Sequence, residues 1–181
     1  MFLLISRFLF MITGWKVNGS VPSGLRQYVI IVAPHTSNQD FFIGIAARSI
    51  LRIDTKYIAK KELFKFPFGW LFRKLGGYPV DRTKNTNLVD AVVELFKKHP
   101  DFSIAITPEG TRSYAPKWKS GFYYIALKAR IPIIMVGFNY AKKEVSVAPP
   151  FMPGGDIEKD MQIMMDHYRD IPGRFPDKGV K

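Results

Sequence analysis

Two runs of consecutive apolar residues constrain the fold of this chain more than any other feature of its sequence. Residues 28–33 read YVIIVA, and residues 132–139 read PIIMVGFN. A strand that is apolar at nearly every position buries both of its faces, whereas a half-exposed strand alternates apolar and polar residues. Both runs therefore predict strands in the interior of a sheet that is covered on both sides.

Helical patterns alternate with these runs and with shorter strand-like segments. Shorter strands are expected at residues 56–59, 78–80, 102–106 and 145–147. Helices are expected at residues 38–51, 87–99, 121–129 and 156–169, with one or two more at 60–75, broken at Pro67. This alternation predicts an α/β fold: a single-domain sandwich with a mixed, largely buried central β-sheet covered by helices on both faces.

The N-terminal residues form an apolar stretch that is too short to span a bilayer and is interrupted by Arg7. We interpret residues 1–14 as a short hydrophobic helix that lies in a membrane interface, where the following Trp15 is also favoured. A buried first helix of the core is the alternative. Residues 15–170 are expected to form one domain, since the whole chain has 181 residues. Residues 171–181 are expected to be a polar C-terminal tail.

The charge balance predicts anionic partners. Lys and Arg number 27 against 15 Asp and Glu, a formal net charge of +12. Nucleic acid, anionic lipid headgroups and an acidic carrier protein all fit such an excess. The chain has no cysteine, which excludes disulfides, thiolate metal sites and a cysteine nucleophile. The three histidines lack metal-ligand spacing, so no metal site is expected.

The most informative motif for chemistry follows the first apolar run, where His35 and Asp40 form an H-x4-D pattern. Ligands of open α/β sheets bind at the carboxyl ends of strands, which is where His35 is expected. Ser37 is expected to cap the following helix, with Asp40 at its third position, where a carboxylate stays ionised. An ionised aspartate can hold one imidazole nitrogen and leave the other as a base. A capping box that performs no chemistry is the alternative for this segment.

Three further motifs follow in order. Residues 76–82 read GGYPVDR, residues 107–113 read TPEGTRS, and residues 131–136 read IPIIMV. Together with the H-x4-D pattern, they resemble the motifs of the glycerophosphate and 1-acylglycerol-3-phosphate (lysophosphatidate) acyltransferase family. The resemblance extends from about Trp15 to Tyr140. Thr107 stands where that family usually has phenylalanine, and the N-terminal hydrophobic segment is shorter than in many members.

The resemblance implies an O-acyltransferase of phospholipid biosynthesis. It implies that His35 is the general base for the attack of a hydroxyl on an acyl thioester, and that Asp40 sets the imidazole tautomer. The acceptor most favoured is the sn-2 hydroxyl of 1-acylglycerol-3-phosphate. The donor, acyl-CoA or acyl carrier protein, is a substrate, and no bound cofactor is expected. The residues expected to bind the acceptor are Arg82, Glu109, Gly110, Thr111 and Arg112.

Other residues allow two interpretations each. Glu109 could position His35 or an arginine, and Lys119 could bind a phosphate or be a surface lysine. Residues 43–47 (IGIAA) could line an acyl tunnel or simply pack a helix. Residues 60–74 read KKELFKFPFGWLFRK, and their interleaved aromatic and basic residues favour contact with an anionic membrane surface over core packing.

Alternative functions remain open at this point. The same mechanism could acylate a lyso-amino-acid lipid, and the same base could activate water for thioester hydrolysis. A non-catalytic protein that binds anionic membranes or nucleic acid would also be basic, although no nucleic-acid recognition motif is present and no nucleic-acid partner is expected. We expect peripheral association with the cytoplasmic face of the inner or plasma membrane.

Overall fold

The computed structural model describes residues 2–80 and 88–180. In these ranges, seven strands form a sheet in the order β1-β7-β6-β2-β5-β3-β4. The strands are β1 (Lys16–Asn18), β2 (Gln27–Ala33), β3 (Lys56–Lys60), β4 (Gly77–Val80), β5 (Phe102–Ile106), β6 (Ile133–Asn139) and β7 (Glu144–Val147). β7 is antiparallel to β6, and the other neighbouring pairs are parallel. The predicted mixed central sheet is confirmed.

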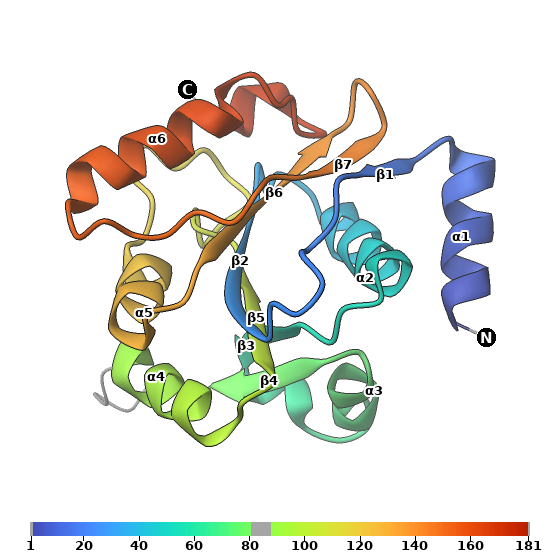
Figure 1. The fold of residues 1–181 in the computed structure, drawn as a ribbon. Helices are drawn as coiled ribbons and strands as arrows, with labels where there is room; N and C mark the ends of the chain where they lie inside the picture. The colour runs from blue at the N-terminus through green and yellow to red at the C-terminus, as the bar shows by residue number, and fades with distance from the viewer. Residues whose placement is uncertain (1, 81–87, 181) are drawn as a thin grey trace.

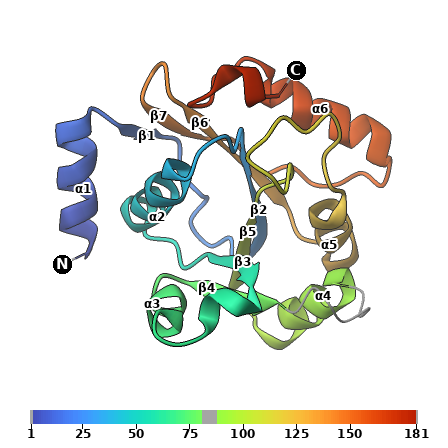
Figure 2. The ribbon, with the colours of Figure 1, turned by 180° about the vertical axis from the view of Figure 1, so that it is seen from behind.

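Helices cover both faces of this sheet (Figure 1). α1 (Phe2–Thr13) and α2 (Gln39–Leu51) lie on one face, with α3 (Gly69–Lys74) toward the β4 edge. α4 (Leu88–Lys98), α5 (Gly121–Ala129) and α6 (Ile157–Arg169) lie on the other face (Figure 2). Two short 3-10 helices, η1 (Lys61–Phe64) and η2 (Pro176–Lys178), complete the elements. The predicted α/β sandwich is therefore confirmed.

The central strand β2 shows why the first apolar run has no polar alternation. Val29 and Ile31 are fully buried in a cluster shared with α4, α5 and α6. Tyr28 and Ile30 point the other way, into a cluster shared with α1 and α2. Since β2 also pairs with β5 on one side and β6 on the other, both of its edges are hydrogen-bonded within the sheet.

The chain breaks near Pro67, as predicted, and a glycine explains how it continues. η1 ends at Phe64, and α3 begins at Gly69. A Cβ atom at position 69 would lie only 1.9 Å from the carbonyl oxygen of Phe64. The close approach of the two backbone segments therefore requires glycine at this position.

The C-terminal residues expected to be a polar tail lie against the body of the protein. Ile171 and Val180 pack on the larger core cluster. The amide of Phe175 donates to Thr36 Oγ1 at 3.2 Å. A Cβ atom at Gly173 would lie 2.8 Å from the same oxygen. Residues 171–180 thus return to the loop that carries His35.

None of the helices found in the described parts of the chain combines the length and the apolar character needed to cross a bilayer. α1 has 12 residues and lies outside α2, on which it packs through Ser6 and Phe10.

Candidate active site

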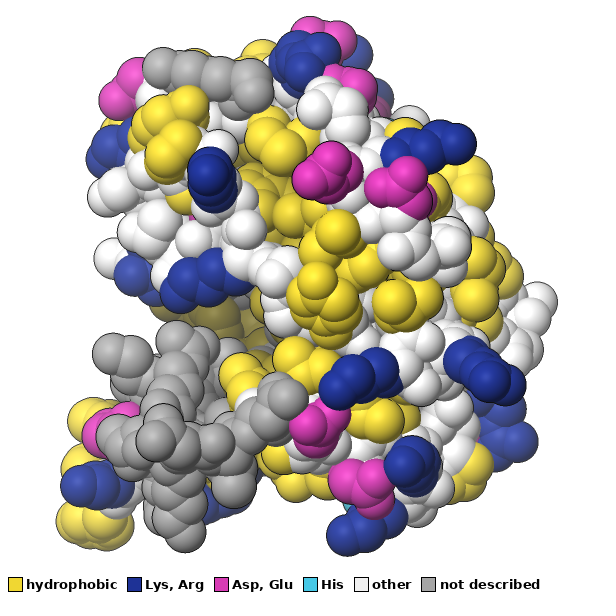
Figure 3. Space-filling model, turned by 90° about the vertical axis from the view of Figure 1, so that its left-hand side faces the viewer, with side chains coloured by type: hydrophobic (Ala, Val, Ile, Leu, Met, Phe, Trp, Pro, Cys, Tyr) yellow, Lys and Arg dark blue, Asp and Glu magenta, His cyan; other side chains and the backbone are white. Residues whose placement is uncertain are grey.

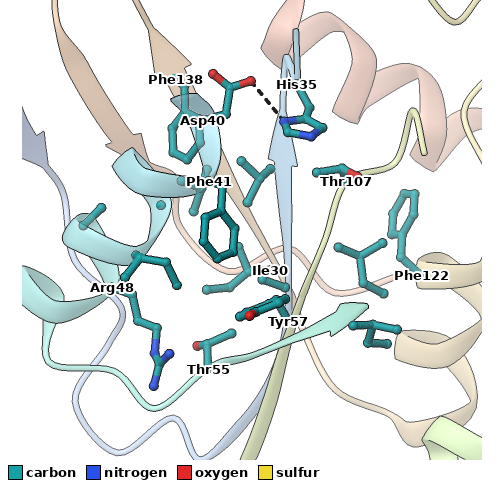
Figure 4. Close-up of a pocket in the computed structure, with 18 of the residues that line it drawn as sticks. Ile30, His35, Asp40, Phe41, Arg48, Thr55, Tyr57, Thr107, Phe122 and Phe138 are labelled. Atoms are coloured by element: carbon teal, nitrogen blue, oxygen red, sulfur yellow. Dashed lines mark hydrogen bonds and ion pairs between the residues drawn. The ribbon is translucent and has the colours of Figure 1, made fainter. Parts of the chain in front are cut away.

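His35 lies in the loop between β2 and α2, at the carboxyl edge of the central strand. Its side chain is 15% exposed and faces Asp40 at the start of α2. His35 Nδ1 lies 3.0 Å from Asp40 Oδ2, and Figure 4 shows the two side chains turned toward each other. The short loop brings together two residues that a regular helix would place on different faces.

The Asp40 carboxylate accepts hydrogen bonds at both oxygens. Oδ2 accepts from the amides of Thr36 and Ser37, each at 2.9 Å, as well as facing His35 Nδ1. Oδ1 accepts from the Tyr140 hydroxyl at 2.5 Å. The side chain of Asp40 is only 1% exposed, so these donors replace nearly all of its water.

The electrostatics of Asp40 favour its ionised form. Burial alone would raise its pKa, but hydrogen bonds from His35, Tyr140 and the Ser37 amide together hold the pKa below its ordinary value. An ionised Asp40 accepts the Nδ1 proton of His35. The second imidazole nitrogen is then unprotonated in the neutral ring and is available as a base.

The start of α2 differs in detail from the prediction. α2 begins at Gln39, its N-cap is Asn38 without a side-chain hydrogen bond, and Asp40 is the second helical residue. Ser37 Oγ nevertheless accepts from the amide of Gln39 at 3.1 Å. Asp40 in turn accepts from the Ser37 amide. The segment therefore has capping-box character and also presents a carboxylate to His35, because the two roles use different hydrogen bonds.

Glu109 lies close to His35, near the start of the loop that follows β5. Its Oε1 accepts from the His35 amide at 2.9 Å. Burial raises the pKa of Glu109, although the hydrogen bond from the His35 amide opposes this. Among the described residues, none bonds its buried Oε2. The sequence left open whether Glu109 positions His35 or an arginine, and the structure shows Glu109 bonded to the loop that carries His35.

The other residues of the TPEGTRS motif lie at the same sheet edge, but not equally close to the site. Gly110 has a φ of +65°, and a Cβ atom there would meet Lys119 at 2.8 Å. Gly110, Arg112 and Lys119 line one cavity together with His35. Thr111 is exposed, accepts from the Ser113 amide at 3.2 Å and is not part of that cavity's wall. Arg82 lies outside the described residues.

A cavity of about 860 Å³ begins at His35 and Asp40 and extends between α2 and the sheet. This volume lies within the range of about 300–1,000 Å³ typical of small-molecule sites. Figure 4 shows Phe41, Ile30 and Phe138 along the cavity and Arg48 at its far end. The side chains from α2 that line it are Phe41, Phe42, Gly44, Ile45, Ala47, Arg48 and Leu51.

The predicted tunnel segment, residues 43–47, is divided between the cavity and the core. Gly44, Ile45 and Ala47 line the cavity. Ile43, Ala46 and also Ala47 belong to the core cluster that contains Phe10 of α1. One face of α2 is therefore available to a ligand, and the other holds the helix in place.

The cavity also reaches side chains on the opposite face of the sheet. β3 and β5 pair only between Lys56 and Ile104 and between Tyr57 and Ala105. The cavity also includes Leu88 and Val89 of α4 and Phe122 and Ile125 of α5. Figure 3, which views the side carrying α4 and α5, shows a hollow floored by hydrophobic side chains with Lys and Arg nearby.

The sequence prediction missed Tyr140, which contributes the only side-chain hydroxyl bonded to Asp40 in the described structure. Tyr140 follows β6, a parallel neighbour of β2. The same rule that places His35 at the carboxyl edge of β2 therefore places Tyr140 beside it. A polar residue directly after a buried strand is the sequence feature that could have identified Tyr140 as part of the site.

The model of the family described as Acyltransferase matches residues 16–139, more than half of the chain. The chain belongs to the acyltransferase family. The match includes the β2–α2 loop with His35 and Asp40, the β5 loop with Glu109, and all of β6.

Two curated relatives share the name 1-acyl-sn-glycerol-3-phosphate acyltransferase. The one from Cocos nucifera is 32% identical over 124 residues, 65% of this chain and 39% of that protein. The one from Streptococcus pneumoniae is 30% identical over 150 residues, 77% of this chain and 54% of that protein. This acyltransferase-family chain thus spans about two fifths to one half of the length of these relatives.

The fold is also similar to that of a solved structure, the 1-acyl-sn-glycerophosphate (LPA) acyltransferase, PlsC, from Thermotoga maritima. The TM-score is 0.64 at 21% sequence identity, over 92% of this chain and 74% of that chain. This likeness supports the same fold for the acyltransferase-family chain.

Proposed function

We propose that this chain transfers a fatty acyl group from an acyl thioester to a hydroxyl of a lysolipid, with the sn-2 hydroxyl of 1-acylglycerol-3-phosphate as the favoured acceptor. The observation that carries the proposal is the His35–Asp40 pair at the head of a long, largely apolar cavity. The names of the two curated relatives support the choice of acceptor.

The proposed reaction uses His35 as a general base. Its unprotonated nitrogen takes the proton of the acceptor hydroxyl while that oxygen attacks the thioester carbonyl carbon. Asp40 stabilises the imidazolium that forms. When the carbon–sulfur bond breaks, the imidazolium returns its proton to the leaving thiolate. The products are an ester and a free thiol, and His35 ends in its starting state.

The two substrates are proposed to occupy chemically different parts of the cavity. The acyl chain is placed along the apolar wall formed by α2 and β6, where residues such as Gly44, Ile45 and Phe138 exclude water. The acceptor phosphate is placed beside Arg112, whose guanidinium can bind phosphate in a bidentate way. Acyl-CoA and acyl carrier protein are both anionic, so the net charge of +12 favours either donor.

A labelled-acyl assay in mixed micelles tests this proposal. Acyl-CoA and acyl carrier protein donors are each combined with 1-acylglycerol-3-phosphate or a lyso-amino-acid lipid. Product from the phosphate-bearing acceptor alone supports the proposed acceptor. Equal or faster acylation of the amino-acid lipid would overturn that choice while leaving the acyl-transfer chemistry in place.

Arg112→Ala should raise the Michaelis constant for the acceptor by about tenfold or more, as expected when a charge-assisted hydrogen bond is lost. The donor Michaelis constant should change little. Arg82→Ala is expected to act in the same direction. Arg26→Ala is the matched control, because Arg26 is an exposed arginine paired with Asp101 at the opposite end of β2. Unchanged acceptor kinetics in both site variants would remove arginines from acceptor recognition.

The proposed site of action is a membrane surface. α1 packs inward through Ser6 and Phe10 and leaves most of its large apolar side chains outside. The exposed ones are Phe2, Leu4, Ile5, Phe8, Leu9, Met11 and Ile12. A helix that turned its apolar side toward the core would show the reverse pattern. We therefore propose that α1 lies in the lipid interface, on the cytoplasmic face of the membrane.

The aromatic segment after β3 is divided between the core and this proposed membrane surface. Phe64 is buried and packs against Phe72, with ring centroids 6.3 Å apart. Phe66 is 97% exposed and Trp70 64% exposed, with Phe68 also exposed between them. α1 and α3 lie on the same side of the sheet as α2 (Figure 1), so one flat membrane could contact both.

Replacing Phe66 and Trp70 together with serine should weaken binding to anionic vesicles by about tenfold or more, since each inserted aromatic ring contributes about 1.5–3 kcal/mol when fully buried. Co-sedimentation with phosphatidylglycerol vesicles measures this change. Tyr124→Ser is the matched control, because Tyr124 is an exposed aromatic on α5 across the sheet. Equal binding by the double variant and the control would contradict a role of this segment in docking.

A further inference from the structure

Tyr140 is the first residue of the β6–β7 turn and lies 100 residues away from Asp40 in the sequence. Its hydroxyl donates to Asp40 Oδ1 at 2.5 Å, while the donors from the β2–α2 loop and His35 converge on Oδ2. The two carboxylate oxygens are thus held by different parts of the chain. Only Tyr140 holds Oδ1 among the side chains that the structure describes.

We propose that Tyr140 is a positioning residue of the active site, which holds the Asp40 carboxylate so that Oδ2 faces His35. The inference rests on the proposed function and extends it to a residue outside the motifs of the family resemblance. Tyr140 acts through Asp40 and contacts neither substrate nor a reacting atom in this scheme.

Asp40 needs Tyr140 to hold it because a carboxylate group can rotate about its terminal bond. A carboxylate group has a broad torsional preference about its terminal bond, so rotamer statistics alone do not fix which oxygen faces His35. With Tyr140 in place, rotation would break a charge-assisted hydrogen bond to a buried oxygen. Without the hydroxyl, Oδ1 would be a buried charged atom lacking a partner, which is costly.

The Tyr140 hydroxyl stays a donor across the working pH range. Burial and the adjacent Asp40 carboxylate raise its pKa far above the ordinary value, while the more distant Arg174 opposes this. A neutral hydroxyl has one proton, and that proton is committed to Asp40 Oδ1.

Tyr140 is held by contacts with both the C-terminal and the N-terminal segments. Its amide donates to the carbonyl of Pro172 at 3.0 Å, within the C-terminal segment. Its ring meets the indole of Trp15 edge-on, with centroids 5.0 Å apart and planes at 89°. Trp15 in turn packs on Phe10 of α1, with centroids 6.3 Å apart. The position of the hydroxyl therefore depends on packing that begins at the N-terminal helix.

The loss of this hydroxyl should alter the hydrogen bond between Asp40 and His35. A hydrogen bond to Oδ1 draws negative charge away from Oδ2, so removing it makes Oδ2 a stronger acceptor for the Nδ1 proton of His35. The magnetic resonance signal of that proton should therefore shift. The other charged groups around the pair are Glu109, which bonds the His35 amide, Arg112 and Lys119 from the same loop between β5 and α5, and Arg174 from the C-terminal segment.

Tyr140→Phe tests the proposal because it removes one oxygen and keeps the ring. The turnover number should fall by about tenfold, as expected for one charge-assisted hydrogen bond, with the Michaelis constants of donor and acceptor unchanged. Tyr123→Phe is the matched control: Tyr123 is fully buried and donates to the Asp160 carboxylate at 2.8 Å, away from the site. It should lower stability and leave turnover intact.

Nuclear magnetic resonance spectra of the histidine ring protons give a readout that does not depend on substrates. The His35 signal is assigned by comparison with His99→Gln and His167→Gln variants. In Tyr140→Phe the signal of the His35 Nδ1 proton, which faces Asp40, should shift, and in Tyr123→Phe it should not. Trp15→Leu, which keeps the hydroxyl but removes the support of the ring, should change turnover in the same direction by a smaller factor and serves if Tyr140→Phe does not fold.

Unchanged turnover together with an unchanged signal of the His35 Nδ1 proton would overturn the positioning role, and so would a rise in a Michaelis constant at constant turnover. If wild-type protein transfers no acyl group in any donor and acceptor combination, the proposed function fails. The Nδ1 proton signal then still decides whether Tyr140 controls the hydrogen bond between His35 and Asp40.

Discussion

His35→Ala is expected to reduce acyl transfer by about 10²–10⁴-fold, the contribution that a positioned general base typically makes. No other described side chain both lines the cavity and is held by Asp40 in the way the His35 ring is. An alanine there leaves the acceptor hydroxyl without a proton acceptor, while the apolar wall that would bind the acyl chain is unchanged. Initial rates at saturating donor and acceptor measure the loss.

The folded state should tolerate this change, because the imidazole lies in a loop and its backbone amide would still donate to Glu109. His99→Ala provides the control, since His99 is exposed after α4 at the far end of the molecule. It should keep wild-type rates. Retention of more than a few per cent of activity in His35→Ala, in protein with a normal melting temperature, would rule out His35 as the base.

Asp40→Asn is expected to be nearly as damaging, although it removes no volume. The amide of asparagine can offer N–H groups to His35 Nδ1, which favours the tautomer with the proton on the other nitrogen. A nitrogen that already carries a proton cannot act as the base. The analogous change in a serine protease triad lowers the turnover number by about 10⁴-fold, and a loss of at least about 10²-fold is expected here.

The same variant should be less stable in a pH-dependent way. The folded-state pKa of Asp40 lies below its unfolded value, so its ionised form contributes stability above about pH 4. This contribution is lost as pH falls through the lower, folded-state pKa. The difference in unfolding free energy between wild type and Asp40→Asn should therefore be full at neutral pH and shrink in strong acid. Denaturant titrations at several pH values measure it.

Asp160→Asn separates the chemical effect of the Asp40 substitution from the loss of stability. Asp160 is also buried, and it accepts from the Tyr123 hydroxyl and the Gly154 amide on the far side of the sheet. Its replacement should destabilise the fold but preserve turnover. If both aspartate variants lost activity in proportion to their stability, Asp40 would be a structural carboxylate only.

The sequence predicts the layers of this fold because each depends on local patterns. Consecutive apolar residues in β2 and β6 identify strands buried on both faces, and the structure places both in the centre of the sheet. The break near Pro67 follows from the restricted backbone of proline. The start of α2 is predicted less well, because Ser37, Asn38 and Gln39 all fit the turn that precedes a helix.

The H-x4-D pair is predictable for the same reason: four residues separate its members, and one tight loop joins them. Tyr140 and the segment at 171–180 reach the site only through tertiary packing. No short sequence spacing therefore links them to His35 or Asp40. The division between buried Phe64 and exposed Phe66 also depends on where α3 folds back. Aromatic composition alone predicts both residues to be on the surface.

The central claim is that His35 directs a thioester's acyl group to a lysolipid hydroxyl and not to water. The most direct measurement follows, in one reaction, the free thiol released and the labelled acyl product formed from purified protein, donor thioester and 1-acylglycerol-3-phosphate. We predict one equivalent of diacylglycerol phosphate for each thiol, and at least about 10²-fold less of both products with His35→Ala. Thiol release matched by free fatty acid would contradict transfer and indicate hydrolysis, and more than a few per cent of the wild-type product from His35→Ala would contradict the role of the histidine.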